Sequence, residues 1–201
     1  MHIAEGVLSA PVLAIGGALA AGGVGIGLRK TEYEKIPEVA VLSSAFFVAS
    51  LIHVPLGPTS VHLILNGLIG LLLGWSAMPA ILVGLALQAI LFQFGGITTL
   101  GVNTVNMALP AVLCFYLFRS FITSDKRAVV LVAAFFCGAV GVFVAGLLVA
   151  CSLFFTGESF LQMARMVVLA HLPIMAIEGI LTSFCVAFLR KVRPEILGVN
   201  K

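Results

Sequence analysis

The sequence predicts an all-α integral membrane protein, a bundle of seven transmembrane helices, and three observations support this fold class. The chain has 201 residues, of which 61% are hydrophobic and only 9% are charged, whereas about a quarter of the residues in a soluble domain are charged. No Asp, Glu, Lys or Arg occurs from Val39 to Phe118, and a transmembrane helix needs about 20 apolar residues. The 21 glycines suit close contact between helices in lipid.

Turn-forming residues must divide the uncharged stretch, because so many residues cannot form one helix. Pro and Gly cluster near residues 55–58, 74–79 and 95–103, and these residue types break helices. We expect one transmembrane domain over residues 1–201, with an N-terminal segment at 1–6 and spans at about 7–28, 39–54, 61–74, 79–93, 104–119, 128–155 and 163–189. The third and fourth spans are short, so they are either tilted helices or a hairpin that does not cross fully.

Small residues recur at helical spacing in the first and sixth spans. In the first span they are Gly16, Ala20, Gly23 and Gly27. In the sixth span they are Gly138, Gly141, Ala145 and Gly146. Such faces predict tight packing against neighbouring helices rather than exposure to lipid.

The basic residues predict how the chain is oriented, because cytoplasmic loops carry an excess of Lys and Arg. With seven spans, all of the 11 basic residues except Arg165 fall on one side of the membrane. We therefore expect the C-terminus in the cytoplasm and the N-terminus outside.

The N-terminal segment places an α-amine, a backbone amide and the His2 imidazole next to one another. If Met1 is retained, these three nitrogens can form fused chelate rings around a square-planar ion such as Ni²⁺, Cu²⁺ or Co²⁺. A histidine at position 2 is also a common accident of sequence. The segment therefore indicates a metal site only in combination with further donors.

All four histidines fall on the predicted outer side, and uncharged polar residues cluster in the same loops or just inside them. Polar groups at membrane depth usually face a cavity or the bundle interior. We expect the following side chains to surround a cavity near His2 and His62: Ser60, Asn66, Gln93, Asn103, Asn106, His171 and His53.

Each of these positions also has a purely structural interpretation. His53 can cap the end of a helix. His62, which we expect at the start of a helix with Asn66 on the same face, can lie among lipid headgroups or act as a metal ligand. Glu178 shares a helix face with His171, and its carboxyl group must be paired or protonated. It can accept a hydrogen bond from a metal-binding residue, or it can make a structural contact with a partner subunit.

The sequence resembles the CbiM/NikM family, the substrate-binding membrane subunit (S component) of energy-coupling-factor cobalt/nickel transporters. The resemblance spans nearly the whole chain in order. The segments that carry it are Met1-His2-Ile3-Ala4-Glu5-Gly6, Gly57-Pro58-Thr59-Ser60-Val61-His62 with Asn66-Gly67, Phe92 to Gly101, Asn103 to Ala108, and Ala170-His171-Leu172-Pro173 with Glu178-Gly179.

The resemblance implies a non-catalytic transporter subunit in the prokaryotic cytoplasmic (inner) membrane that captures Co²⁺ or Ni²⁺ with Met1, His2 and His62. It implies three kinds of partner: a transmembrane coupling subunit, a pair of ATPases, and a small accessory membrane subunit. The sequence has no nucleotide-binding glycine loop, so we expect the partners to supply the energy.

Two alternatives stay open. The first is a subunit specific for Ni²⁺ rather than Co²⁺, since both ions accept nitrogen donors. The second is a membrane protein of another class, either a carrier of an organic solute or an enzyme. One Trp and two Tyr provide few aromatic residues for an organic pocket, and no nucleophile lies beside His171 and Glu178.

Overall fold

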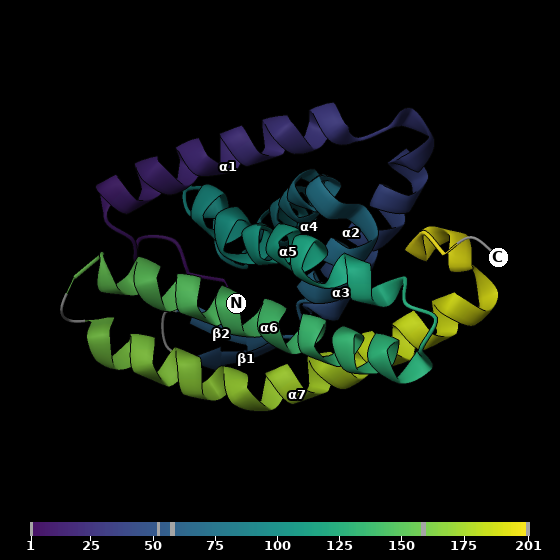
Figure 1. Ribbon diagram of the computed structural model, residues 1–201. Coiled ribbons are helices and arrows are strands. Elements are labelled where there is room, and N and C mark those ends of the chain that lie inside the picture. Colours follow the sequence, from purple (N-terminus) through teal and green to yellow (C-terminus); the bar gives the residue numbers. More distant parts are fainter. Residues whose placement is uncertain (1, 52, 57–58, 158–159, 200–201) are drawn as a thin grey trace.

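The computed structural model describes residues 2–51, 53–56, 59–157 and 160–199, with residues 53–56 and 59–61 described by their backbone. Helices dominate this part of the chain, and a two-stranded antiparallel hairpin interrupts them (Figure 1). The elements are α1 (Ala10–Lys30), η1 (Tyr33–Lys35), α2 (Ile36–Ala49), β1 (His53–Leu56), β2 (Thr59–His62), α3 (Asn66–Leu73), η2 (Gly74–Ser76), α4 (Ala77–Phe92), α5 (Leu100–Ile122), α6 (Arg127–Phe154), α7 (Leu161–Val192) and η4 (Pro194–Leu197).

Five helical stretches among the described residues are long and apolar enough to cross a membrane. They are α1, α5, α6, α7 and the stretch Asn66–Phe92, which joins α3, η2 and α4 and changes direction at η2. Helix α2 has 14 residues, which corresponds to about 21 Å at 1.5 Å per residue and is shorter than the hydrocarbon core of about 30 Å. The fold is therefore that of a helical membrane protein, while the predicted count of seven spans, with the third and fourth either tilted or a partial hairpin, stays a prediction.

The third predicted span, at 61–74, is helical only from Asn66. Its first residues pair with β1 in the hairpin, where His53 lies opposite His62 in the register. Leu65 then adopts the left-handed conformation (φ 56°), so helix α3 begins only at Asn66 and has 8 residues. His62 and Asn66 consequently do not share a helix face, and neither His53 nor His62 lies in a helix.

The chain reverses direction between α3 and α4. Gly74 takes φ 55° and ψ −123°, a conformation open mainly to glycine, and the turn η2 follows. This turn lies beside the C-terminal end of α1, where the Thr31 hydroxyl donates to Ser76 Oγ over 2.8 Å and the Lys30 ammonium lies 5.4 Å from the centre of the Trp75 ring. Helix α4 then runs back toward the N-terminal end of α1.

Glycine allows the helices to approach closely, as the small-residue faces predicted. Gly16, Ala20 and Gly27 of α1 are buried, and a Cβ added at Gly16 would lie 2.4 Å from Val102 of α5. A Cβ at Gly138 of α6 would lie 2.5 Å from the carbonyl oxygen of Glu178 on α7. Helices α6 and α7 lie side by side on one side of the bundle, and α1 lies on the opposite side (Figure 1).

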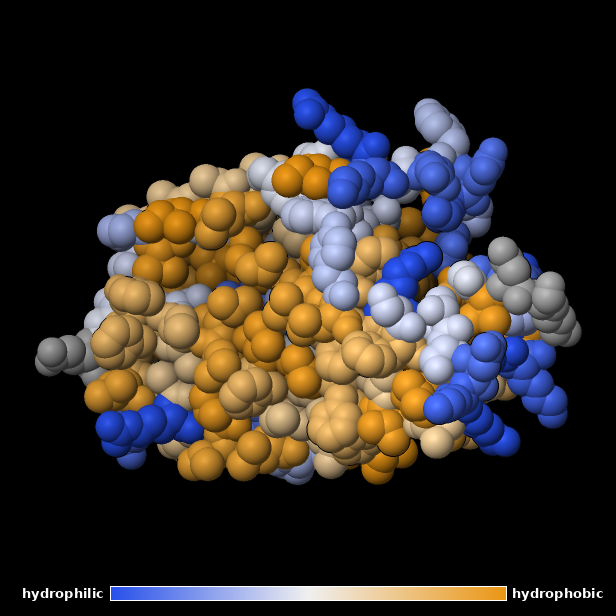
Figure 2. Space-filling view, in the orientation of Figure 1, coloured by the Kyte–Doolittle hydropathy of each residue, from blue (hydrophilic) through white to orange (hydrophobic). Residues whose placement is uncertain are grey.

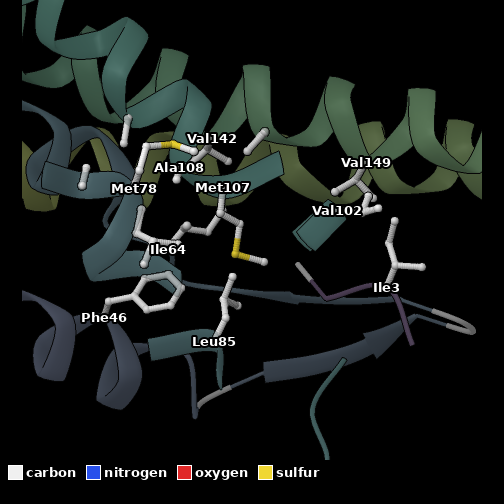
Figure 3. Packing of buried hydrophobic residues seen from close by; sticks show 14 of the residues in the cluster. Ile3, Phe46, Ile64, Met78, Leu85, Val102, Met107, Ala108, Val142 and Val149 are labelled. Atoms are coloured by element: carbon white, nitrogen blue, oxygen red, sulfur yellow. The ribbon is translucent and has the colours of Figure 1, made fainter. Parts of the chain in front are cut away.

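The main hydrophobic core lies between these layers. Phe46 of α2, Leu85 of α4 and Met107 of α5 are fully or almost fully buried in it. Ile3, from the N-terminal segment, joins the same core with no exposed surface (Figure 3). The N-terminal segment is therefore part of the packed interior.

Most strongly hydrophilic residues gather at the end of the bundle that carries the C-terminus and the connection between α1 and α2 (Figure 2). A smaller hydrophilic group lies at the opposite end, and a broad apolar surface covers the middle (Figure 2). Exposed basic residues at the end that carries the C-terminus come from the ends of several elements and include the following: Arg29, Lys30, Lys35, Arg119, Lys126, Arg127, Lys191 and Arg193. Such a division of charge is typical of a protein that crosses a bilayer with its basic end in the cytoplasm.

Candidate metal centre

The N-terminal segment is held inside the bundle by the side chain of Asn103 on α5. The backbone N–H of Ile3 donates to Asn103 Oδ1 over 3.0 Å, and Asn103 Nδ2 donates back to the Ile3 carbonyl over 3.2 Å. Because one amide side chain satisfies both backbone groups of a buried residue, the segment enters the apolar core without unpaired groups at this point.

A second attachment lies three residues after His2. Glu5 Oε1 accepts a hydrogen bond of 3.1 Å from the backbone N–H of Thr98. The preceding Gly96 has φ 142°, and a Cβ at this position would lie 2.7 Å from Glu5 Cβ. The glycine therefore lets the loop between α4 and α5 close over the N-terminal segment.

These attachments bring the rings of His2 and His62 together. The rings are stacked, with centroids 4.6 Å apart and an interplanar angle of 28°. Their residues are only 4% and 2% exposed. The ring of Phe94 lies 6.2 Å from that of His2 and covers the same region. Two imidazoles that are 60 residues apart in the sequence thus share one buried space.

The hydrogen bonds of the two rings determine which nitrogens can bind a metal. His62 Nδ1 lies 2.7 Å from the Leu63 carbonyl oxygen, which can only accept, so Nδ1 carries the proton and Nε2 carries a lone pair. His2 Nε2 contacts the amide oxygen of Gln88, so the lone pair of His2 lies on Nδ1. This is the ring nitrogen that can close a chelate ring with the backbone amide nitrogen of its own residue.

Side chains alone do not complete a metal site here. No group of three or more His, Cys, Asp or Glu side chains gathers anywhere in the described part of the chain. An ion at the two rings would therefore need backbone or terminal nitrogens as further donors. The predicted ligand Met1 lies outside the described residues.

The other predicted cavity residues occupy different places. Asn103 lies against the N-terminal segment, as described above. Asn106 Nδ2 donates to Ser152 Oγ of α6 over 3.3 Å, and Asn66 Nδ2 donates to the Gly141 carbonyl over 3.0 Å, so both link neighbouring helices. Gln93 ends α4 in the left-handed conformation (φ 58°) with an exposed side chain.

His171 lies in the interior of α7 and is 2% exposed. Its Nδ1 donates to the Val167 carbonyl one turn earlier, and its ring packs on Gly146 of α6. The side chains of His53 and Ser60 lie outside the described residues.

Two residues were not expected at this site. Gln88 of α4 contacts the His2 ring and donates to Ser50 Oγ. Ser50, at the end of α2, was not singled out. Both are polar residues without exposed surface in an apolar bundle, which is the signal that could have identified them.

Comparison with known proteins agrees with the fold. The family described as "Cobalt uptake substrate-specific transmembrane region" matches residues 2–196. A putative metal transport protein of Haemophilus influenzae is 43% identical over 98% of this chain and 97% of its own length. The cobalt transport protein CbiM of Sorangium cellulosum is 33% identical over 98% of this chain and 94% of its own length.

The similarity extends to three dimensions. A crystal structure of a transition metal transporter superposes with a TM-score of 0.82 at 27% identity, covering 96% of this chain and 93% of that one. Together with the family match across nearly the whole sequence, this places the chain among membrane proteins of metal transport. The chain belongs to the CbiM/NikM family of cobalt and nickel transport proteins.

Proposed function

We propose that this protein is the substrate-binding subunit of an energy-coupling-factor importer, which captures Co²⁺ or Ni²⁺ outside the cytoplasmic membrane. The proposed ligands are the α-amine of Met1, the amide nitrogen and ring Nδ1 of His2, and Nε2 of His62. Four nitrogens suit a square-planar ion. The bulky His2 would favour retention of Met1 and hence of the free amine.

One observation carries this proposal: the buried His2 and His62 rings are stacked with centroids 4.6 Å apart. In each ring one nitrogen carries the proton, and the other nitrogen keeps a lone pair for a metal ion. The Leu63 carbonyl and the Gln88 amide oxygen receive these protons. Hydrogen bonds of this kind fix the tautomer and orientation of metal-ligating histidines. A packed apolar shell around the rings would exclude water from a bound ion.

Release of the ion would require His62 to move away from His2. The backbone N–H groups of Ile64 and Leu65 both donate to Glu178 Oε1 on α7, so the segment after His62 is tied to that helix. A displacement of α7 would therefore pull on His62 and open the site. The energy for this movement would come from a coupling subunit with its pair of ATPases, in some assemblies with a small accessory membrane subunit.

Equilibrium dialysis and calorimetry of the detergent-purified protein test the function. We expect the wild-type protein to bind Ni²⁺ and Co²⁺. Ni²⁺ should bind more tightly, because the affinity of nitrogen donors for divalent metals rises from Co²⁺ to Ni²⁺. His62→Ala should abolish tight binding and leave the thermal unfolding transition in place, since His62 ends a strand. A wild-type protein that binds an organic vitamin and neither metal would show that the protein carries an organic solute.

A further inference from the structure

A chain of hydrogen bonds links the backbone of α2 to the His2 ring. Ser50 Oγ donates to the Phe47 carbonyl over 2.9 Å, and Gln88 Nε2 donates to Ser50 Oγ. The oxygen of the same Gln88 amide faces His2 Nε2. Ser50 and Gln88 have no exposed surface, so water does not compete for these bonds.

The backbone carbonyl at the start gives the chain one direction. A carbonyl can only accept, so the Ser50 hydroxyl proton points at Phe47 and the Ser50 oxygen accepts from the Gln88 NH₂ group. The Gln88 amide must then present its oxygen to His2, and that oxygen accepts the proton on Nε2. The lone pair of His2 is therefore held on Nδ1, on the side of the ring nearest its own backbone.

Joining α2 to α4 is not sufficient to explain this arrangement. Ser43, two turns before Ser50 on α2, already donates to the Ala80 carbonyl of α4 over 2.7 Å without reaching a histidine. A buried amide in an apolar helix is costly unless all its groups are paired. An apolar residue at position 88 would hold the helices together at less cost.

We propose that Ser50 and Gln88 are positioning residues of the metal site, which select the His2 tautomer and ring orientation that present Nδ1 to the ion. This inference rests on the proposed function. We call the chain of hydrogen bonds from Phe47 through Ser50 and Gln88 to His2 the relay. Without the relay, the His2 ring could carry its proton on Nδ1 or rotate about χ1 and χ2, and either change would remove the chelating nitrogen. Loss of such an outer contact typically lowers metal affinity about 10- to 100-fold.

Four variants of the full-length protein test the relay. Gln88→Leu removes both ends of the amide, Ser50→Ala removes the hydroxyl that orients it, and Gln88→Glu keeps an oxygen that accepts from His2 Nε2. Ser43→Ala is the matched control, because it deletes the other serine hydroxyl between α2 and α4. The measurements are the dissociation constants for Ni²⁺ and Co²⁺, the ligand-field absorption of bound Ni²⁺, and thermal unfolding.

We expect Gln88→Leu to weaken Ni²⁺ binding about 10- to 100-fold and to change the absorption of the bound ion, with a smaller loss for Ser50→Ala. Gln88→Glu should restore most of the affinity and the wild-type spectrum, and Ser43→Ala should leave both unchanged. Wild-type affinity and spectrum in Ser50→Ala and Gln88→Leu would overturn the relay. A wild-type protein that does not bind either ion would instead overturn the proposed function.

Discussion

Glu178 on α7 accepts a hydrogen bond of 2.9 Å from the backbone N–H of Leu65, at the N-terminal end of α3. The same carboxylate oxygen accepts from the N–H of Ile64. An acidic side chain at a helix N-terminus is stabilised by the exposed N–H groups and by the helix dipole. This explains how a glutamate without exposed surface is accommodated deep in an apolar helix, and it connects α7 to the segment that carries His62.

We predict that Glu178→Leu destabilises the protein, because it leaves the N–H groups of the buried Ile64 and the half-buried Leu65 without their acceptor. The buried group alone costs about 1–3 kcal/mol. Glu178→Gln keeps an oxygen that can accept both bonds and should lose less. Thermal unfolding in detergent measures the difference, and metal titration should show weaker binding in the Leu variant. A Leu variant as stable as the wild type would contradict the role of this contact.

Addition of one alanine before Met1 should reduce metal affinity by several kcal/mol, corresponding to about a thousandfold or more. The added residue moves the free amine away and replaces it with a peptide nitrogen, and the added chain crowds a site next to the fully buried Ile3. The same residue added at the C-terminus is the control and should have no effect. Calorimetry with Ni²⁺ compares the two, and equal affinities would exclude the N-terminal amine as a ligand.

Gly70→Ala should destabilise the bundle by about 1–3 kcal/mol through overpacking. A Cβ at Gly70 of α3 would lie 2.0 Å from the carbonyl oxygen of Ala111 on α5, and backbone cannot yield as a side chain does. Gly22→Ala on α1 is the matched control, since a Cβ there meets no atom within 4 Å and alanine favours a helix by up to about 1 kcal/mol. The midpoint temperature of thermal unfolding should therefore fall for Gly70→Ala and not for Gly22→Ala.

Cysteine labelling tests the orientation that the basic residues predict. In a variant without the four native cysteines, Gly157→Cys between α6 and α7 should react with a membrane-impermeant reagent in intact cells. Lys126→Cys, before α6 on the basic end, should react only after the cells are opened. The reverse pattern would place the N-terminal metal site on the cytoplasmic face.

The sequence predicted the close helix contacts, and it placed the start of the third helix too early. Glycines at helical spacing in α1 and α6 are a local feature, and the structure packs them against neighbouring helices, as Gly16 against α5 and Gly138 against α7. The stretch from residue 61 to 74 is equally apolar, and its hydropathy placed the start of the predicted third span at residue 61. Pairing of β1 with β2 and the two bonds to Glu178 hold residues 59–65 outside a helix, and neither effect is visible in a local window.

The sequence by itself determined that this chain is a helical membrane protein, that its basic residues lie at one end, and that His2 and His62 are candidate donors. The first two properties follow from the residues one by one, because transfer of apolar and charged groups between water and lipid depends on each residue alone to a first approximation. The third follows from the imidazole nitrogen, which binds metal ions. Only the tertiary structure decided that the two rings stack, that Asn103 inserts the N-terminal segment, and that Ser50 and Gln88 orient His2. A hydrogen bond forms only when the distance between donor and acceptor is correct to within a few tenths of an ångström. For residues remote in the chain, only the packed fold defines that distance.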